Sequence, residues 1–217
     1  MAHRISGGDL GRVVTFSDAV VAVAITLLVI PLVSVTAPGP DRPLIAVITD
    51  NWRQIVAFLL TFVIVYILWQ GHHRIFENFA AIDDRIITLN GLWLLTVVFL
   101  PWPSRMLDVD GNGTQAVWLY CVTLFLNAAL LDLIYRRGRR RADLLIDPGL
   151  WPRWSLSAEF AGIFAALTVV ALFRPQVALW ALWVVIPLRF VAQQEGRLRS
   201  LLWPSAPEGG PDLGSRP

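Results

Sequence analysis

Residues 12–32 read RVVTFSDAVVAVAITLLVIPL, and this run sets the character of the whole chain. Its apolar part, from Val13 to Leu32, has 20 residues, which in a helix extend about 30 Å and match the hydrocarbon core of a bilayer. Asp18 lies about two turns inside this helix, where an ionisable group is costly unless it is partnered or hydrated. The run therefore predicts a membrane-spanning helix, with Asp18 either at a functional site or at headgroup level.

The composition extends this interpretation to the rest of the chain. Of the 217 residues, 56% are hydrophobic and 16% are charged, and the mean hydropathy is +0.60. These values exclude an ordinary soluble domain and indicate an integral membrane protein. All 18 basic residues are arginine and the net charge is only +2, so we expect no nucleic-acid partner. Cys121 is the single cysteine, which permits no internal disulfide. No motif requires a cofactor or a metal.

Apolar runs recur along the sequence, separated by short connections rich in glycine and proline. We therefore predict an all-α integral membrane protein with an N-terminal segment at 1–12, a six-span domain at 13–193 and a C-terminal tail at 194–217. The predicted spans are Val13–Val33, Ile55–Gln70, Ile86–Ser104, Gln115–Tyr135, Leu156–Phe173 and Gln176–Gln193.

The arginines predict the orientation of these spans. Fourteen fall on one side of the six-span layout and four on the other. Because basic residues favour the cytoplasmic side, both termini are expected there, in a multi-pass protein of the cell membrane. A cleaved signal peptide is the alternative for the first span, but that run contains Pro31 and its removal would put the two termini on opposite sides.

The first span has two different faces. At 100° per residue, Val23, Leu27 and Ile30 fall on one stripe, and Thr26 lies about 60° to the side of Val23. The polar residues 17–18 lie about 120° to 140° from Val23. We therefore expect one face that is apolar apart from a threonine, and a polar face bound to neighbouring helices. The simpler interpretation is that the apolar stripe also packs between helices.

Three segments carry motifs with fixed spacing. The first is R-x3-F-S-D followed by A-x2-I-T-L-L at residues 22–28, the second is W-x2-H-H-x2-F at 69–76, and the third is N-G-L-W-L-L at 90–95. Together they resemble the endosomal/lysosomal potassium channels and their bacterial homologues, most densely in the first span. The signature residues of that span are Arg12, Phe16, Ser17 and Asp18.

The resemblance implies a homotetramer whose first helices surround a central pore. It implies passive permeation of K⁺ and other monovalent cations, with protons as a further permeant, through a hydrophobic constriction that gates by narrowing and dewetting. Carried over by position, the constriction would be formed by rings of Val23, Thr26 and Ile30, with Leu27 on the same face. The family usually has isoleucine or leucine where this chain has Val23, so that ring should be wider here.

The cytoplasmic ends of the first three spans are expected to meet. Trp69 and Asn90 then lie at the depth of Asp18, and buried polar groups between helices require partners. We predict an interhelical hydrogen-bond network of Arg12, Ser17, Asp18, His73 and Asn90, with Trp69 beside it.

Two other classes of function remain open. A small secondary transporter or proton-coupled carrier would use Asp18 and His73 as its coupling site, and an assembly factor would transport nothing. A metal enzyme is disfavoured, because adjacent His72 and His73 point to different helix faces and no HExxH spacing occurs. The basic run Arg136–Arg141 is expected to be a solvated loop beside anionic headgroups, with a specific lipid or nucleotide site as the alternative.

Overall fold

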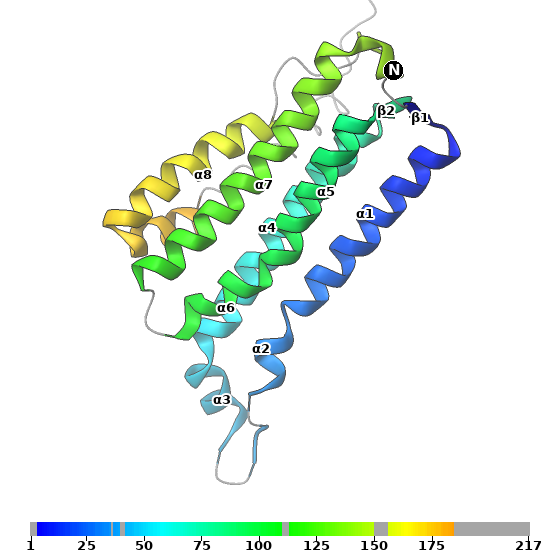
Figure 1. Cartoon of the computed structure of the whole chain (residues 1–217). Coiled ribbons are helices and arrows are strands. Elements are labelled where there is room, and N and C mark those ends of the chain that lie inside the picture. Colours follow the sequence, from blue (N-terminus) through cyan, green and yellow to red (C-terminus); the bar gives the residue numbers. More distant parts are fainter. Residues whose placement is uncertain (1–3, 36, 40–41, 110–112, 150–155, 185–217) are drawn as a thin grey trace, which may run out of the picture. The chain divides into compact units, whose positions relative to one another are not determined.

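The computed structural model describes residues 4–35, 37–39, 42–109, 113–149 and 156–184 (Figure 1). The chain divides into two units, residues 1–181 and 182–217, and the architecture below is that of the first. Its elements are β1 (Arg4–Ser6), α1 (Gly8–Leu27), α2 (Ile30–Val33), α3 (Leu44–Asp50), α4 (Trp52–Phe76), β2 (Ala81–Asp83), α5 (Asp84–Phe99), α6 (Pro101–Val109), α7 (Thr114–Arg140), the 3₁₀ turn η1 (Ala142–Leu144) and α8 (Leu156–Phe173).

Among the described residues, four helical segments are long and apolar enough to cross a membrane. Two shorter apolar helices follow, Ser157–Phe173 and Pro175–Val184. The predicted fifth span therefore forms a helix within the expected bounds, whereas part of the predicted sixth lies outside the described residues. The four long segments are Gly8–Val33, Trp52–Phe76, Asp84–Leu107 and Thr114–Arg140.

The long helices extend beyond the apolar runs that predicted them. The first begins at Gly8, inside the segment 1–12 that was expected to precede it. The second continues from the predicted end at Gln70 to Phe76. Polar residues at a helix end can reach water or headgroups. The helix can therefore continue past the hydrocarbon core until its backbone hydrogen bonds end.

Prolines divide two of the spans. Pro31 has no N–H, and the backbone before it tightens: Leu28 and Val29 donate to the carbonyls three residues back, at 3.2 and 3.3 Å, so α1 ends and α2 begins. Pro101 acts in the same way between α5 and α6, where the Leu100 N–H donates to the Val97 carbonyl at 3.3 Å.

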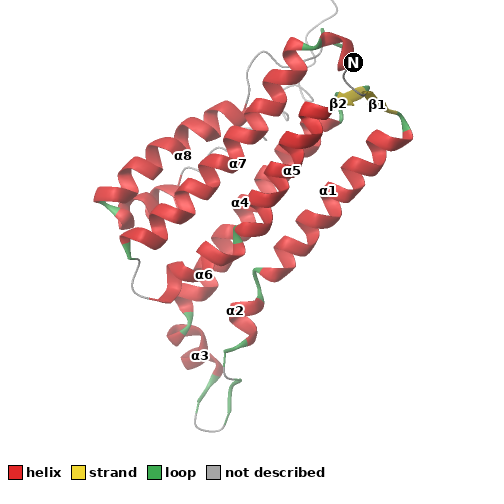
Figure 2. Ribbon diagram, viewed as in Figure 1, coloured by secondary structure: helices red, strands yellow, loops and turns green. Residues whose placement is uncertain are grey.

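The predicted all-α class is confirmed, and one short ribbon of two strands accompanies the helices. Strands β1 and β2 pair antiparallel, with Arg4 opposite Asp83 and Ser6 opposite Ala81 (Figure 2). Gly7 follows β1 with φ of +60°, a conformation that favours glycine, and it turns the chain directly into α1. This short ribbon fixes the start of α1 beside the start of α5.

The helices form a bundle in which α1 packs on α4 and α5, α5 packs on α7, and α7 packs on α8 (Figure 1). The core is continuous at the end of the bundle that holds the ribbon. Ten hydrophobic residues are buried there together: Leu10, Phe76, Phe79, Ala81, Ile82, Ile86, Ile134, Tyr135, Leu144 and Leu145.

Buried polar side chains bridge the helices farther along the bundle. The Trp93 indole N–H of α5 donates to Asn127 Oδ1 of α7 at 3.0 Å, and Asn127 Nδ2 donates to Thr96 Oγ1 at 2.7 Å. The hydroxyls of Thr61 in α4 and Tyr120 in α7 lie 3.0 Å apart. Such bonds fix the relative register of helices that apolar contacts alone would leave free to slide.

Asp83 holds the end of α7 to the start of α5. Its Oδ1 accepts the Ile86 backbone N–H at 3.0 Å, which caps α5, and its Oδ2 accepts Arg137 Nη2 at 2.7 Å. Burial acts to raise the pKa of Asp83, but these hydrogen bonds and the charges of Arg137 and Arg141 outweigh it, so the pKa lies below its usual value. The carboxylate is therefore charged at neutral pH.

Candidate functional site

Helix α1 has one face turned into the bundle. Ser17, Val21, Ala24 and Leu28 are buried there, at intervals of four, three and four residues, which is one stripe of a helix. The small side chain of Ala24 suits a close approach to a neighbouring helix. This face is the one that contacts α4 and α5.

The opposite face of α1, which Ile30 continues at the start of α2, is open. Val23 is 58% exposed, Leu27 39% and Ile30 52%, and Thr26 is exposed among them. We call these four residues the exposed stripe. They are the residues that the sequence placed together on the apolar face, and no described part of the chain covers them. The Thr26 hydroxyl donates to the Val23 carbonyl at 2.7 Å, so the oxygen keeps its lone pairs for a further partner.

On the buried face a directional chain of hydrogen bonds runs through Asn90. Ser17 Oγ donates to the Val13 carbonyl at 2.8 Å, so it accepts from Asn90 Nδ2, at 2.9 Å. The other atom of that amide, Asn90 Oδ1, then faces His72 Nε2 at 2.8 Å. Because Oδ1 can only accept, the geometry assigns the proton of neutral His72 to Nε2.

Asp18 makes a separate contact with α4. Its Oδ1 accepts the indole N–H of Trp69 at 2.8 Å, and the carboxylate is half-buried. The Trp69 ring in turn stacks on the His73 ring, with centroids 5.6 Å apart. Asp18 and Trp69, which the sequence predicted to lie at a similar depth, are in direct contact in the structure.

Two members of the predicted network lie elsewhere. The histidine bonded to Asn90 is His72, not His73, whose Nε2 lies 3.0 Å from exposed Glu77. Arg12 is 86% exposed, and its nearest acid is Asp9 at 3.7 Å. Phe16 of the signature is 62% exposed and lies outside the network.

The helical phase of α4 explains why His72 is the buried histidine. Leu68, His72 and Phe76 recur at intervals of four and are all buried, whereas His73 is 100° away around the helix. The His72 ring lies between Phe76 and Trp93, with centroids 4.3 and 4.2 Å away. Because α4 carries large apolar residues on its exposed as well as its buried faces, its sequence alone does not show which histidine is buried.

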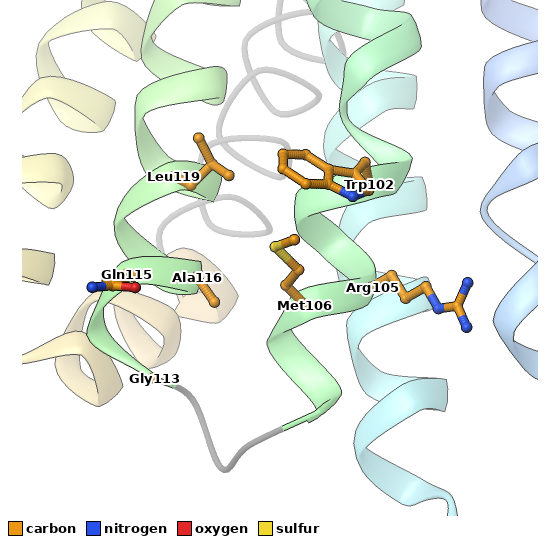
Figure 3. Close-up of a pocket in the computed structure, with 7 residues that line it drawn as sticks. All are labelled: Trp102, Arg105, Met106, Gly113, Gln115, Ala116 and Leu119. Atoms are coloured by element: carbon orange, nitrogen blue, oxygen red, sulfur yellow. The ribbon is translucent and has the colours of Figure 1, made fainter.

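Other types of site find little support in the described residues. No group of three His, Cys, Asp or Glu side chains among them could hold a metal ion. A pocket of about 630 Å³ lies between α6 and α7, where Trp102, Met106 and Leu119 form apolar walls. Figure 3 shows the Arg105 guanidinium pointing out of this pocket, so no charged group is directed into it.

These features define a helical membrane protein with several spans, whose first helix is bonded to its neighbours along one face and open along the other. Residues 12–101 match the family model described as "Endosomal/lysosomal potassium channel TMEM175". This matched segment, less than half of the chain, is similar to the TMEM175 family.

Individual proteins are also similar to this chain in sequence. A potassium channel of Streptomyces collinus is 38% identical over 99 residues, 46% of this chain and 48% of the relative. A potassium channel of Chamaesiphon minutus is 37% identical over 100 residues, 46% and 49% of the two chains. The human endosomal/lysosomal proton channel TMEM175 is 28% identical over 127 residues, 57% of this chain and 24% of the relative. The chain spans about half the length of the bacterial relatives that it matches.

A solved structure shares the fold. The crystal structure of a lysosomal potassium-selective channel TMEM175 homolog from Chamaesiphon minutus superposes with a TM-score of 0.68 at 22% identity, over 86% of this chain and 98% of that one. The likeness extends beyond the segment of sequence similarity to most of the chain.

Proposed function

We propose that the protein is a potassium-permeable cation channel that conducts passively along the α1 helices of several subunits. The observation that carries the proposal is the exposed stripe: Val23, Leu27 and Ile30 point away from the bundle to which the other face of α1 is bonded. The segment that matches the family model, residues 12–101, includes most of this helix and Ile30. We infer the transported ion and the assembly from the exposed stripe together with this family match.

The chemistry of the stripe supports a hydrophobic constriction. Apolar rings offer no carbonyl cage to replace the hydration shell of an ion, so such a pore controls conduction by its diameter and by dewetting. The sequence has no Thr-Val-Gly-Tyr-Gly filter. Thr26 supplies an oxygen whose proton is directed to the Val23 carbonyl, which leaves lone pairs free for a cation. We therefore expect a modest preference for K⁺ over Na⁺, and proton permeation beside it, as the animal relatives' name suggests.

A single stripe cannot enclose a pathway, so the proposal includes a homotetramer around the α1 helices. It also includes six spans within residues 13–193, with the segments 1–12 and 194–217 on the cytoplasmic side of the cell membrane. In this arrangement the bonds of Ser17 and Asp18 to α5 and α4 keep the stripe directed at the axis.

Potassium efflux from loaded liposomes that contain the purified protein tests the proposal with a matched pair of variants. Val23→Trp should abolish potassium flux by filling the constriction. Val169→Trp on α8, where the valine is also 58% exposed, should leave flux unchanged because that position faces lipid or another helix. Equal loss in both variants, or in neither, would contradict a pore at the stripe.

The form of the wild-type flux separates the other classes. A channel gives fast flux that does not saturate with ion concentration, whereas saturable or proton-coupled flux would indicate a carrier, and no flux an assembly factor. The carrier hypothesis requires Asp18 and His73 to act as a pair; the Trp69 indole N–H bonds to Asp18 and its ring stacks on His73, and the acid that His73 contacts is Glu77.

A further inference from the structure

A groove of about 350 Å³ lies between α5 and α7, at the end of the bundle where α7 finishes. Its walls combine two leucines with four arginines, a pairing of apolar and cationic surface that the proposed conduction does not use. The lining residues are Arg85, Leu89, Leu133, Arg136, Arg137 and Arg140.

Two of the four arginines already have acidic partners. Arg137 binds buried Asp83, and Arg136 forms an ion pair with Asp132 one turn earlier on α7. Within the described part of the chain, no carboxylate lies at ion-pair distance from Arg85 or Arg140. Both are exposed, so the groove presents two uncompensated guanidinium groups, one from each helix.

The two helices change from cationic to apolar in the same direction. On α7, Leu133 precedes the arginines by one to two turns on the same stripe, and on α5, Leu89 follows Arg85 by one turn. Farther into the bundle, Leu92 and Leu126 continue these faces, each 46% exposed. Along the groove, the arginines therefore lie at the end of the helices and the leucines lie next to them, toward the middle of the helices.

We propose that this groove binds one anionic phospholipid, with the phosphate on Arg85 and Arg140 and an acyl chain along Leu89 and Leu133. Guanidinium groups bind phosphate oxygens through paired N–H donors, which suits the two free arginines. A nucleotide fits less well, because no aromatic side chain lines the groove to stack on a base. The two leucines beside the arginines give the groove an apolar surface that suits a lipid tail.

Native mass spectrometry of the full-length protein in mild detergent tests this site. Titration with dioleoyl-phosphatidylglycerol should give a bound-lipid complex that dioleoyl-phosphatidylcholine forms more weakly. Arg85→Gln and Arg140→Gln should each weaken phosphatidylglycerol binding by about fivefold, the effect of one cation near an anionic lipid. Arg139→Gln is the matched control: it removes an exposed arginine of α7 that does not line the groove.

Two results would overturn the proposal. One is an equal effect of Arg139→Gln and Arg140→Gln on phosphatidylglycerol binding, which would mean that only the general positive charge matters. The other is binding of soluble glycerol phosphate as tightly as the lipid, which would assign the arginines to a free phosphate. Leu133→Asn should weaken lipid binding without changing glycerol phosphate binding, and thermal melting of each variant verifies that it is folded.

Discussion

Asn90 is the residue on which the buried face of α1 depends. Its amide is the only side chain in the described structure that bonds to both Ser17 and His72, and all three are buried. An amide can do this because it carries a donor and an acceptor on adjacent atoms. A carboxylate in its place would accept from His72 but could not donate to Ser17, whose own proton is directed to the Val13 carbonyl.

Replacement of Asn90 by leucine should therefore destabilise the protein. The change keeps a similar volume but leaves the Nε2 proton of His72 without an acceptor, at a cost of about 1–3 kcal/mol in the free energy of unfolding. Thermal melting in detergent measures the loss. Thr88→Val on the exposed side of the same helix, where the hydroxyl bonds only to the Asp84 carbonyl, is the control and should have a small effect. Equal melting temperatures for the Asn90 variant and wild type would contradict the proposed role.

The sequence predicted that Ser17, Asp18 and Asn90 lie at a common depth, because the spans that carry them are defined by long apolar runs. It did not distinguish His72 from His73, because neighbouring residues differ by only 100° and the buried phase of a helix depends on which neighbours pack against it. The exposure of Arg12 depends on tertiary structure, because the ribbon sets the direction in which α1 begins.

At the scale of elements, the apolar runs predicted the helices but not their ends or the ribbon. A bilayer-length run predicts where a helix must exist, whereas its polar extensions depend on local capping and on contacts such as His72 with Trp93. Strands of three residues have too few positions for a period of two to be recognised. Their pairing depends on the approach of α1 to α5, which no local pattern encodes.

The junction of β2, α5 and α7 should make stability depend on pH through Asp83. Its folded-state pKa lies below the unfolded value, so the unfolded chain binds more protons in acid and stability falls as pH falls. The contribution is complete above about pH 5 and is lost as pH approaches the folded-state pKa. Asp83→Asn should therefore lower the melting temperature at pH 7 and flatten its dependence on pH below 5. Asp9→Asn, at an exposed carboxylate, is the control; the same flattening there would argue against the Asp83 assignment.

At the scale of the whole molecule, the exposed stripe and the exposed side of α8 are alike in composition but have different expected environments. Val23 on α1 and Val169 on α8 have the same exposed fraction, although a pore would place one beside water and the bilayer would place the other beside lipid. Composition cannot separate these cases, because both surfaces are apolar. Reactivity toward a water-soluble reagent can.

Cysteine accessibility should distinguish the two surfaces. Thr26→Cys puts a thiol on the exposed stripe and Val169→Cys puts one on α8, while the native Cys121 is buried and serves as an internal negative control. In liposomes, a charged, membrane-impermeant thiol reagent should modify Cys at position 26 and reduce potassium flux, because a hydrated pathway is open to it and the added charge obstructs a narrow apolar ring. Position 169 should remain unmodified, since a charged reagent does not enter the hydrocarbon core. Modification at 169 but not at 26 would place lipid against α1 and remove the stripe from any conduction pathway.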